Sequence, residues 1–146
     1  MIVDTSALAA IVFREPGFEE ILDRITLADT PAGVPATALA ELGMVLSARL
    51  NIDPRSLIAR LVEQCGLEVI PFGGHHWAAA VGAAQRFGRG RHRAGLNFGD
   101  CLSYATADLA GEPLLFVGDD FAQTDIEAAM PARGGSITES NSGYAP

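Results

Sequence analysis

Acidic residues stand directly after two apolar stretches of this chain, where the strands of a buried sheet would end. Asp4 follows the apolar run 1–3, and Asp119 and Asp120 follow the run 114–117 after a single glycine. A short apolar run that stops at a polar residue suits a strand buried on both faces. In open parallel sheets, ligands bind beyond the carboxyl ends of the strands, so we expect these carboxylates to point toward one shared edge.

Two further acids belong to helices that are expected to start near this edge. Glu41 falls in the first turns after a short strand expected near Val34, and Asp100 falls in the first turn of the helix that LNFGDCL opens. Each acid also has an ordinary structural explanation. Asp100 stands three residues after Asn97, which is the spacing of a capping box, and Glu41 alone could be a solvated helix residue. The acids that follow strands could be turn residues. Their joint arrangement is what favours a functional site.

Carboxylates that meet at one place repel one another strongly. Two unit charges about 4 Å apart repel by about 4 kcal/mol at an effective dielectric of about 20, whereas a small domain is stable by only about 5 to 15 kcal/mol. Such a cluster must take up protons, pair with arginines or bind cations. Ligation by oxygen alone favours Mg²⁺ or Mn²⁺, which suits phosphoester hydrolysis by activated water without a protein nucleophile.

Alternating strand and helix patterns surround these acids. We expect strands at 1–3, near Val34, at 67–72 and at 114–117, and helices at 7–13 after a Thr5 or Ser6 cap, 18–25, 39–50, from an Asp53-Pro54 cap to Cys65, 75–87 and 97–109. Strands separated by helices imply an α/β sandwich around a mainly parallel sheet. Residues 1–132 are expected to form one domain. Residues 133–146 are polar and glycine-rich without an apolar period, so we expect a disordered tail.

The charged residues are unevenly distributed. The net charge is −8, with 18 acidic residues against 10 basic ones, and the chain contains no lysine. An acidic chain is a poor nonspecific binder of nucleic acid. However, the stretch RFGRGRHR brings Arg86, Arg89, Arg91 and Arg93 together directly before the Asp100 helix. Arginine forks suit bidentate phosphate contacts, so this stretch is expected to hold phosphates beside the acids. The alternative is a solvated, flexible connection.

Other residues carry weaker signals. His75 and His76 adjoin each other at a helix start and suit surface or capping roles. Cys101 suits a small buried residue, and Phe72 and Trp77 are expected in the core. The sequence shows neither a signal-peptide pattern nor a membrane-spanning segment, and its two cysteines form no CxxC pair. We therefore expect a cytoplasmic protein without a membrane partner.

Four phrases of the sequence together resemble one known family. MIVDTSALAAI, PATALAELGMVLSAR, GRGRHRAGLNFGDCLSYATA and LLFVGDDFAQTDI occur in this order over residues 1 to 130. They resemble the PIN-domain nucleases, specifically the VapC toxins of toxin-antitoxin modules. The resemblance implies a PIN-like three-layer α/β/α sandwich around a four- or five-stranded sheet. It further implies a Mg²⁺- or Mn²⁺-dependent endoribonuclease that cleaves structured RNA such as tRNA or ribosomal RNA, forms a homodimer and is silenced by a VapB-type antitoxin.

The resemblance also assigns roles to individual residues. Asp4 and Asp100 match the metal ligands of the family, Glu41 completes the site, and either Asp119 or Asp120 supplies the fourth acid. Supporting roles fall to Thr5 and Ser6, which could orient water or cap the helix, and to Asp125 as an outer group. The chain departs from the family at Arg93, where relatives often carry proline, and at Val117, where they often carry lysine. Neither departure touches an expected ligand.

Three other functions compete with this interpretation. An aspartyl-phosphate enzyme or receiver domain would also place an aspartate after the first strand, but those chemistries generally use a lysine, which this chain lacks. A noncatalytic PIN-fold module could bind RNA or a protein without cutting. An acidic cluster could also hydrolyse a small phosphoester. The presence of acids at every motif position argues against the noncatalytic module.

Overall fold

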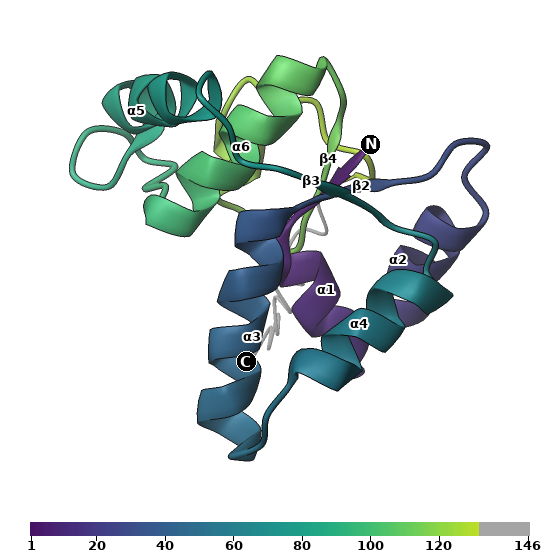
Figure 1. The fold of residues 1–146 in the computed structure, drawn as a ribbon. Helices are drawn as coiled ribbons and strands as arrows, with labels where there is room; N and C mark the ends of the chain where they lie inside the picture. The colour runs from purple at the N-terminus through teal and green to yellow at the C-terminus, as the bar shows by residue number, and fades with distance from the viewer. Residues whose placement is uncertain (132–146) are drawn as a thin grey trace, which may run out of the picture.

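The computed structural model describes residues 1–131, which fold as a four-stranded sheet flanked by helices (Figure 1). The elements follow one another as β1 (Ile2–Val3), α1 (Thr5–Val12), α2 (Phe18–Thr26), β2 (Gly33–Pro35), α3 (Ala36–Leu50), α4 (Arg55–Gln64), β3 (Glu68–Ile70), α5 (His76–Phe87), α6 (Phe98–Ala110), β4 (Leu114–Leu115) and a 3₁₀ turn at Phe121–Gln123. The tail expected to be disordered, 133–146, lies outside the described residues.

All pairings in the sheet are parallel, in the strand order β3-β2-β1-β4. Successive residues of a strand face opposite sides of the sheet, and each side of this sheet has its own core. Val3 and Leu115 pack with α1, α2, α3 and α4, whereas Ile2 and Leu114 pack with α5 and α6. Figure 1 shows α5 and α6 on one side of the strands and α1, α2 and α4 on the other. The expected three-layer α/β/α sandwich is confirmed.

Two expected helix caps are wrong. The N-cap of α1 is Asp4, whose carboxyl accepts a hydrogen bond from the Ser6 N–H, so neither Thr5 nor Ser6 caps this helix. The helix α4 begins one residue later than expected, with Pro54 as its N-cap, although Asp53 still accepts a hydrogen bond from the Arg55 N–H. In both places an aspartate side chain accepts a hydrogen bond from the amide two residues ahead of it.

The start of α5 corrects the prediction for Trp77. Its side chain is 62% exposed, so the expectation of a core position is wrong. Phe72 is half-buried and packs against the core beside α5 and α6. The capping role expected at this helix start falls to His76, whose Nδ1 accepts a hydrogen bond from the Gly73 N–H. Within residues 1–131, no helix has the length and apolar character needed to cross a membrane.

Candidate active site

Asp4 stands at the carboxyl end of β1, and its side chain is 4% exposed. Its Oδ2 accepts hydrogen bonds from the backbone N–H of Ser6 at 3.0 Å and from the Ser6 hydroxyl at 2.6 Å. That hydroxyl in turn accepts a hydrogen bond from the Val117 N–H at 3.0 Å, just beyond β4. The neighbouring Thr5 hydroxyl donates to the Ala38 carbonyl in α3. Ser6 therefore fixes the Asp4 carboxylate between two strand ends, and Thr5 ties α1 to α3.

Asp100 lies in the first turn of α6, where it forms the capping box expected from its spacing. Its backbone N–H donates to Asn97 Oδ1 at 2.9 Å, and its Oδ2 accepts from the Asn97 N–H at 3.0 Å. Burial raises the pKa of Asp100 to about 6, against the hydrogen bond from Asn97, and the charges of Asp4 and Asp120 raise it further. Asp100 therefore caps the helix although burial makes its ionised form unfavourable.

Glu41 approaches the same place from α3, half-buried. Burial raises its pKa first, and the charges of Asp4 and Asp100 add to the increase. Its carboxyl lies against Gly99, where a Cβ would collide with both carboxyl oxygens. The missing side chain at position 99 therefore lets α6 and the Glu41 carboxyl meet. The sequence contained a signal for this role, because glycine in the first turn of a helix lowers helix propensity and needs a reason.

The two acids after β4 have different surroundings, although both are exposed. The charge of Asp120 raises the pKa of Asp100. Asp119 instead lines a separate cavity of about 270 Å³ together with Ile21 and Met130. The loop geometry therefore brings Asp120 toward the other acids and directs Asp119 toward α2.

The acids brought together in this way offer oxygen ligands alone, which suits a hard divalent cation. In residues 1–131, no three acidic, histidine or cysteine side chains stand close enough together to form a preformed metal cage. The hydrogen bonds to Asp4 and Asp100 engage Oδ2 of each carboxyl. Burial is the main cause of the raised pKa values of Glu41 and Asp100, and the charges of neighbouring acids add a repulsion that a cation would relieve. These residues fit a divalent ion held by small movements of their side chains.

Asp125 lies in a different cluster, with Arg86 and Tyr104. Its Oδ1 accepts a hydrogen bond from the Tyr104 hydroxyl, and its Oδ2 accepts one from Arg86, both at 2.6 Å. These two bonds lower the pKa of Asp125, and burial together with the hydrogen bond to Asp125 raises the pKa of Tyr104 to about 12. Arg86 also lies over the Phe87 ring. The cluster joins α5 and α6 to the segment after the 3₁₀ turn, so Arg86 and Asp125 hold each other in a structural role.

Replacing Asp125 by asparagine is expected to lower the free energy of unfolding by less than about 1 kcal/mol, since the carboxylate and its arginine are both largely exposed. Because the pKa of Asp125 is lowered in the folded state, this contribution is present at neutral pH and disappears as the pH falls below the ordinary aspartate value. Urea unfolding at pH 7 and pH 3 measures it. Catalytic activity should stay at the wild-type level, and a large loss of activity would place Asp125 in the active site.

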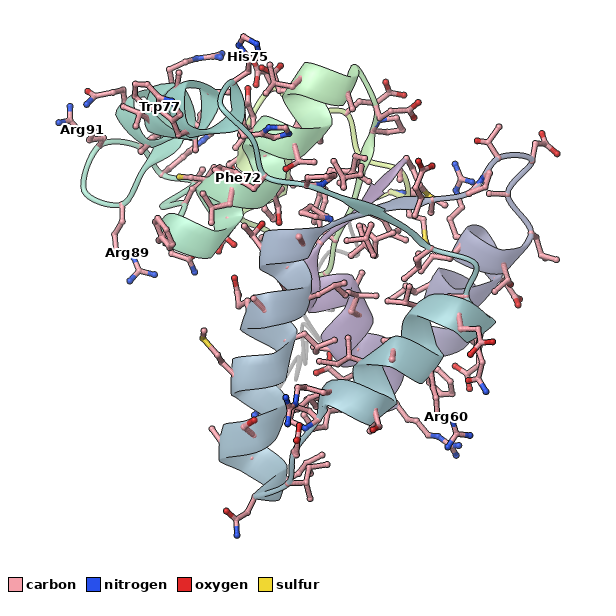
Figure 2. The ribbon with its side chains drawn as sticks, viewed as in Figure 1. Arg60, Phe72, His75, Trp77, Arg89 and Arg91 are labelled. Atoms are coloured by element: carbon pink, nitrogen blue, oxygen red, sulfur yellow. The ribbon has the colours of Figure 1, made fainter. Side chains whose placement is uncertain are left out.

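The other three arginines of the stretch RFGRGRHR, which are Arg89, Arg91 and Arg93, belong to a hydrogen-bonded loop between α5 and α6. The Arg89 N–H donates to the Leu96 carbonyl at 3.1 Å, and the Leu96 N–H donates to the Phe87 carbonyl at 2.9 Å. Inside the loop, His92 Nδ1 accepts from the Ala94 N–H, and its ring packs edge-on against Phe87. The Arg89 charge lowers the pKa of Asp100, which places this guanidinium near the acids. Figure 2 shows Arg89 and Arg91 projecting from the loop. Arg93 is also exposed.

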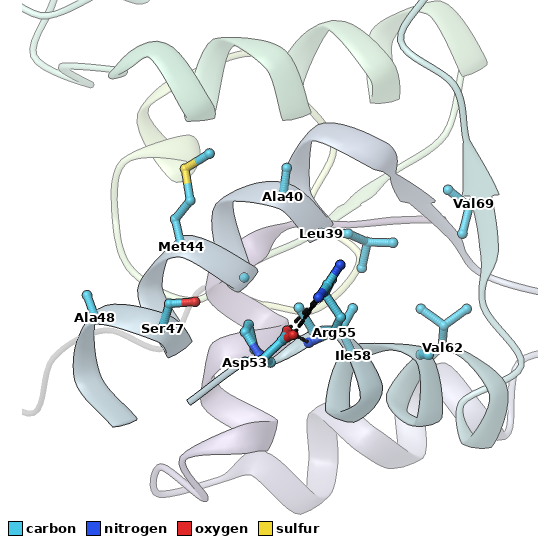
Figure 3. Close-up of a pocket in the computed structure, with 13 residues that line it drawn as sticks. Leu39, Ala40, Met44, Ser47, Ala48, Asp53, Arg55, Ile58, Val62 and Val69 are labelled. Atoms are coloured by element: carbon cyan, nitrogen blue, oxygen red, sulfur yellow. Dashed lines mark hydrogen bonds and ion pairs between the residues drawn. The ribbon is translucent and has the colours of Figure 1, made fainter. Parts of the chain in front are cut away.

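An apolar groove between α3 and α4 has a volume of about 1270 Å³ (Figure 3). Its ionisable side chains are Asp53 and Arg55, which form an ion pair with a 2.7 Å distance between Oδ2 and a guanidinium nitrogen. Hydrogen bonds from Arg55 lower the pKa of Asp53 to about 2. The carboxylate that lines this groove is therefore paired with an arginine.

A family model for the PIN domain matches residues 1–127. Ribonuclease VapC36 of Mycobacterium tuberculosis is 47% identical over 87% of this chain and 91% of the relative, and Ribonuclease VapC of Mycolicibacterium smegmatis is 38% identical over 88% and 98%. The crystal structure of Mycobacterium tuberculosis VapC20, described as a Sarcin-Ricin loop cleaving toxin, superposes with a TM-score of 0.67 at 18% identity over 86% of this chain and 95% of that one. A toxin-antitoxin complex from Klebsiella pneumoniae gives a TM-score of 0.62 at 18% identity, over 85% and 92%. The chain belongs to the PIN-domain family, among its VapC members.

Proposed function

We propose that this chain is the ribonuclease toxin of a toxin-antitoxin module and hydrolyses RNA phosphodiester bonds with Mg²⁺ or Mn²⁺ held by Asp4, Glu41 and Asp100. The observation that carries the proposal is the electrostatic coupling of these carboxyls from β1, α3 and α6: burial raises the pKa values of Glu41 and Asp100, the charge of Asp4 raises both further, and the charge of Asp100 adds to the increase at Glu41. The identity of 47% with a VapC ribonuclease supports the choice of RNA as substrate. An RNA target places the activity in the cytoplasm.

Each acid has a distinct part in this proposal. Asp4 would be a ligand held by Ser6, Asp100 would be a ligand held by the capping box with Asn97, and Glu41 would complete the set from α3. Asp120 is the fourth acid, since it interacts with Asp100 and is exposed, and its carboxylate accepts the proton of the attacking water. The bound ion supplies Lewis-acid polarisation of the phosphoryl group. Asp119 is left outside the reaction.

The partners follow from the same proposal. Arg89 and Arg91 contact the RNA backbone beside the acids, so that a chain with a net charge of −8 can still hold a polyanion. Structured RNA such as tRNA or ribosomal RNA is the proposed substrate class. The similarity to the Klebsiella pneumoniae toxin-antitoxin complex supports a VapB-type antitoxin as the protein partner, and the active toxin is proposed to be a homodimer.

The proposal is tested by incubating the purified chain with tRNA and ribosomal RNA in Mg²⁺, in Mn²⁺ and in EDTA. We expect fragments with discrete ends in either metal and intact RNA in EDTA. RNA that is bound but never cut would instead support a noncatalytic PIN-fold module. Hydrolysis of a small chromogenic phosphodiester with no cleavage of RNA would support the phosphohydrolase alternative.

Replacing Gly99 by alanine should impair cleavage without unfolding the chain. The new Cβ would force aside the flexible end of Glu41, while alanine improves helix propensity. We expect a loss of cleavage of about tenfold or more, because small misplacements of a catalytic group are costly, and a melting temperature at or above that of the wild type. Gly82→Ala is the matched control, since a Cβ there meets nothing within 4 Å. If both variants lost cleavage activity equally, the displacement of Glu41 would not explain the loss.

A further inference from the structure

A second cavity, of about 860 Å³, is bounded by α5, by the start of α6 and by the loop 88–97 between these helices, which we call the arginine loop. It also borders α3, so that it touches both helices that carry Glu41 and Asp100. Thr37 lines it one helical turn before Glu41 on α3, and Phe98 lines it two residues before Asp100 on α6. Arg89, which also acts on Asp100, forms part of its wall. A ligand in this cavity would therefore extend toward the acids.

The walls of this cavity present aromatic rings to solvent. Trp77 is 62% exposed and Phe98 is 81% exposed, whereas Leu96 beneath them is buried. Large aromatic side chains left in water around a concave surface mark a binding site, because their faces offer apolar area with little loss of conformational freedom on binding. Figure 2 shows Trp77 on α5 at the same end of the molecule as the arginine loop.

The polar groups of the cavity define what it can bind. Arg89 and Arg91 give it positive charge on an acidic protein, which selects an anionic partner. Thr37 lines the cavity on its α3 side. Flat apolar rings beside cations match a nucleotide, which combines a flat base with an anionic phosphate.

We propose that this cavity receives one unpaired base of the RNA, stacked against Trp77 and Phe98, while Arg89 and Arg91 hold the adjoining phosphates. The bound base positions the next phosphodiester bond at Asp4, Glu41 and Asp100. This inference rests on the proposed ribonuclease function for the identity of the strand. It makes the substrate a single-stranded segment, such as a loop, because a paired base cannot leave its stack without a cost. An apolar segment of a protein partner would use the rings but would leave the two arginines without an anion.

The test uses Trp77 itself, which is the single tryptophan of the chain. The Asp100→Asn variant in Mg²⁺ is titrated with a single-stranded oligoribonucleotide of mixed sequence, and with the same strand annealed to its complement. We expect saturable quenching of tryptophan fluorescence by the single strand and little quenching by the duplex. Adding Phe98→Ala should weaken single-strand binding about fivefold or more, the lower end of what one stacked base contributes. Adding Met44→Ala, an equally exposed apolar truncation on α3, should leave it unchanged.

Several results would overturn the inference. The tryptophan fluorescence could stay unchanged when RNA is added, or it could be quenched equally by the duplex. The Phe98→Ala variant could also bind the single strand as tightly as its parent. Fluorescence that changes with protein concentration alone would assign the cavity to a second copy of the chain, and quenching only by a protein partner would assign it to that partner. Failure of the proposed function is distinguishable: a chain that binds single strands with Trp77 quenching but cuts no RNA in either metal retains the base site and loses the ribonuclease assignment.

Discussion

Asp100→Asn is expected to reduce RNA cleavage by about 100-fold or more while the chain stays folded. Removing one preorganised charge from a reaction centre typically costs this much, and this carboxyl is one of the three proposed cation ligands. Asparagine keeps the capping geometry, because its amide oxygen can accept the hydrogen bond that Asp100 accepts from the Asn97 N–H. Cleavage rates in Mg²⁺ measure the loss. Asp108→Asn, an exposed aspartate on the same helix, is the matched control and should cut at the wild-type rate.

The stability of the same variant separates a lost ligand from a lost fold. The folded-state pKa of Asp100 is about 6, above its ordinary value, so its ionisation destabilises the metal-free protein increasingly as the pH rises from about 4 through 6. Asparagine removes that penalty, and we expect about 1 kcal/mol of added stability at pH 7 after allowance for the partial exposure of the carboxyl. The gain should vanish near pH 4. A variant that unfolds, or that cuts RNA like the wild type, would contradict the assignment.

Millimolar Mn²⁺ is expected to raise the melting temperature of the wild-type chain by about 5 to 10 °C. A ligand that binds only the native state at 100 times its Kd stabilises it by about 2.7 kcal/mol, and a domain of this size gains roughly 3 °C for each kcal/mol. The shift should be smaller at pH 5 than at pH 7, because protons compete with the metal for a carboxyl whose pKa is about 6.

Two controls define this thermal experiment. Asp4→Asn should abolish most of the shift, because it removes the ligand that Ser6 fixes in place. A parallel melt in Ca²⁺ at the same concentration shows whether the rise in melting temperature requires an ion as small as Mn²⁺. A melting temperature that Mn²⁺ leaves unchanged at pH 7 would show that the acids do not form a cation site before RNA arrives.

The positions of the principal acids could be predicted because local patterns determine them. The apolar run 1–3 places Asp4 at a strand end, and the alternation of Ile2 and Val3 between the two cores fixes the sheet at the centre of three layers. The spacing from Asn97 to Asp100 predicts the capping box that the structure contains. These features depend on contacts between residues close in the sequence, together with the rule that ligands bind at the carboxyl ends of parallel strands.

The remaining features depend on tertiary contacts that no local pattern encodes. Asp119 and Asp120 are adjacent acids, and only the course of the loop after β4 turns one toward Asp100 and the other toward α2. Arg86 resembles the other arginines of its stretch, yet Asp125 and Tyr104 from distant parts of the chain engage it. The prediction of a core position for Trp77 is wrong because it rests on the general burial of large hydrophobic residues, whereas this exposed ring borders a cavity.

The central claim is that Asp4, Glu41 and Asp100 together hold a divalent cation, and electron paramagnetic resonance of Mn²⁺ tests it most directly. The free-ion signal should fall as wild-type protein is added, and it should persist with Asp4→Asn, Glu41→Gln or Asp100→Asn at equal concentration. The Asp108→Asn control should bind like the wild type. If all three acid variants remove free Mn²⁺ as effectively as the wild-type chain does, the cation binds elsewhere and the account is wrong.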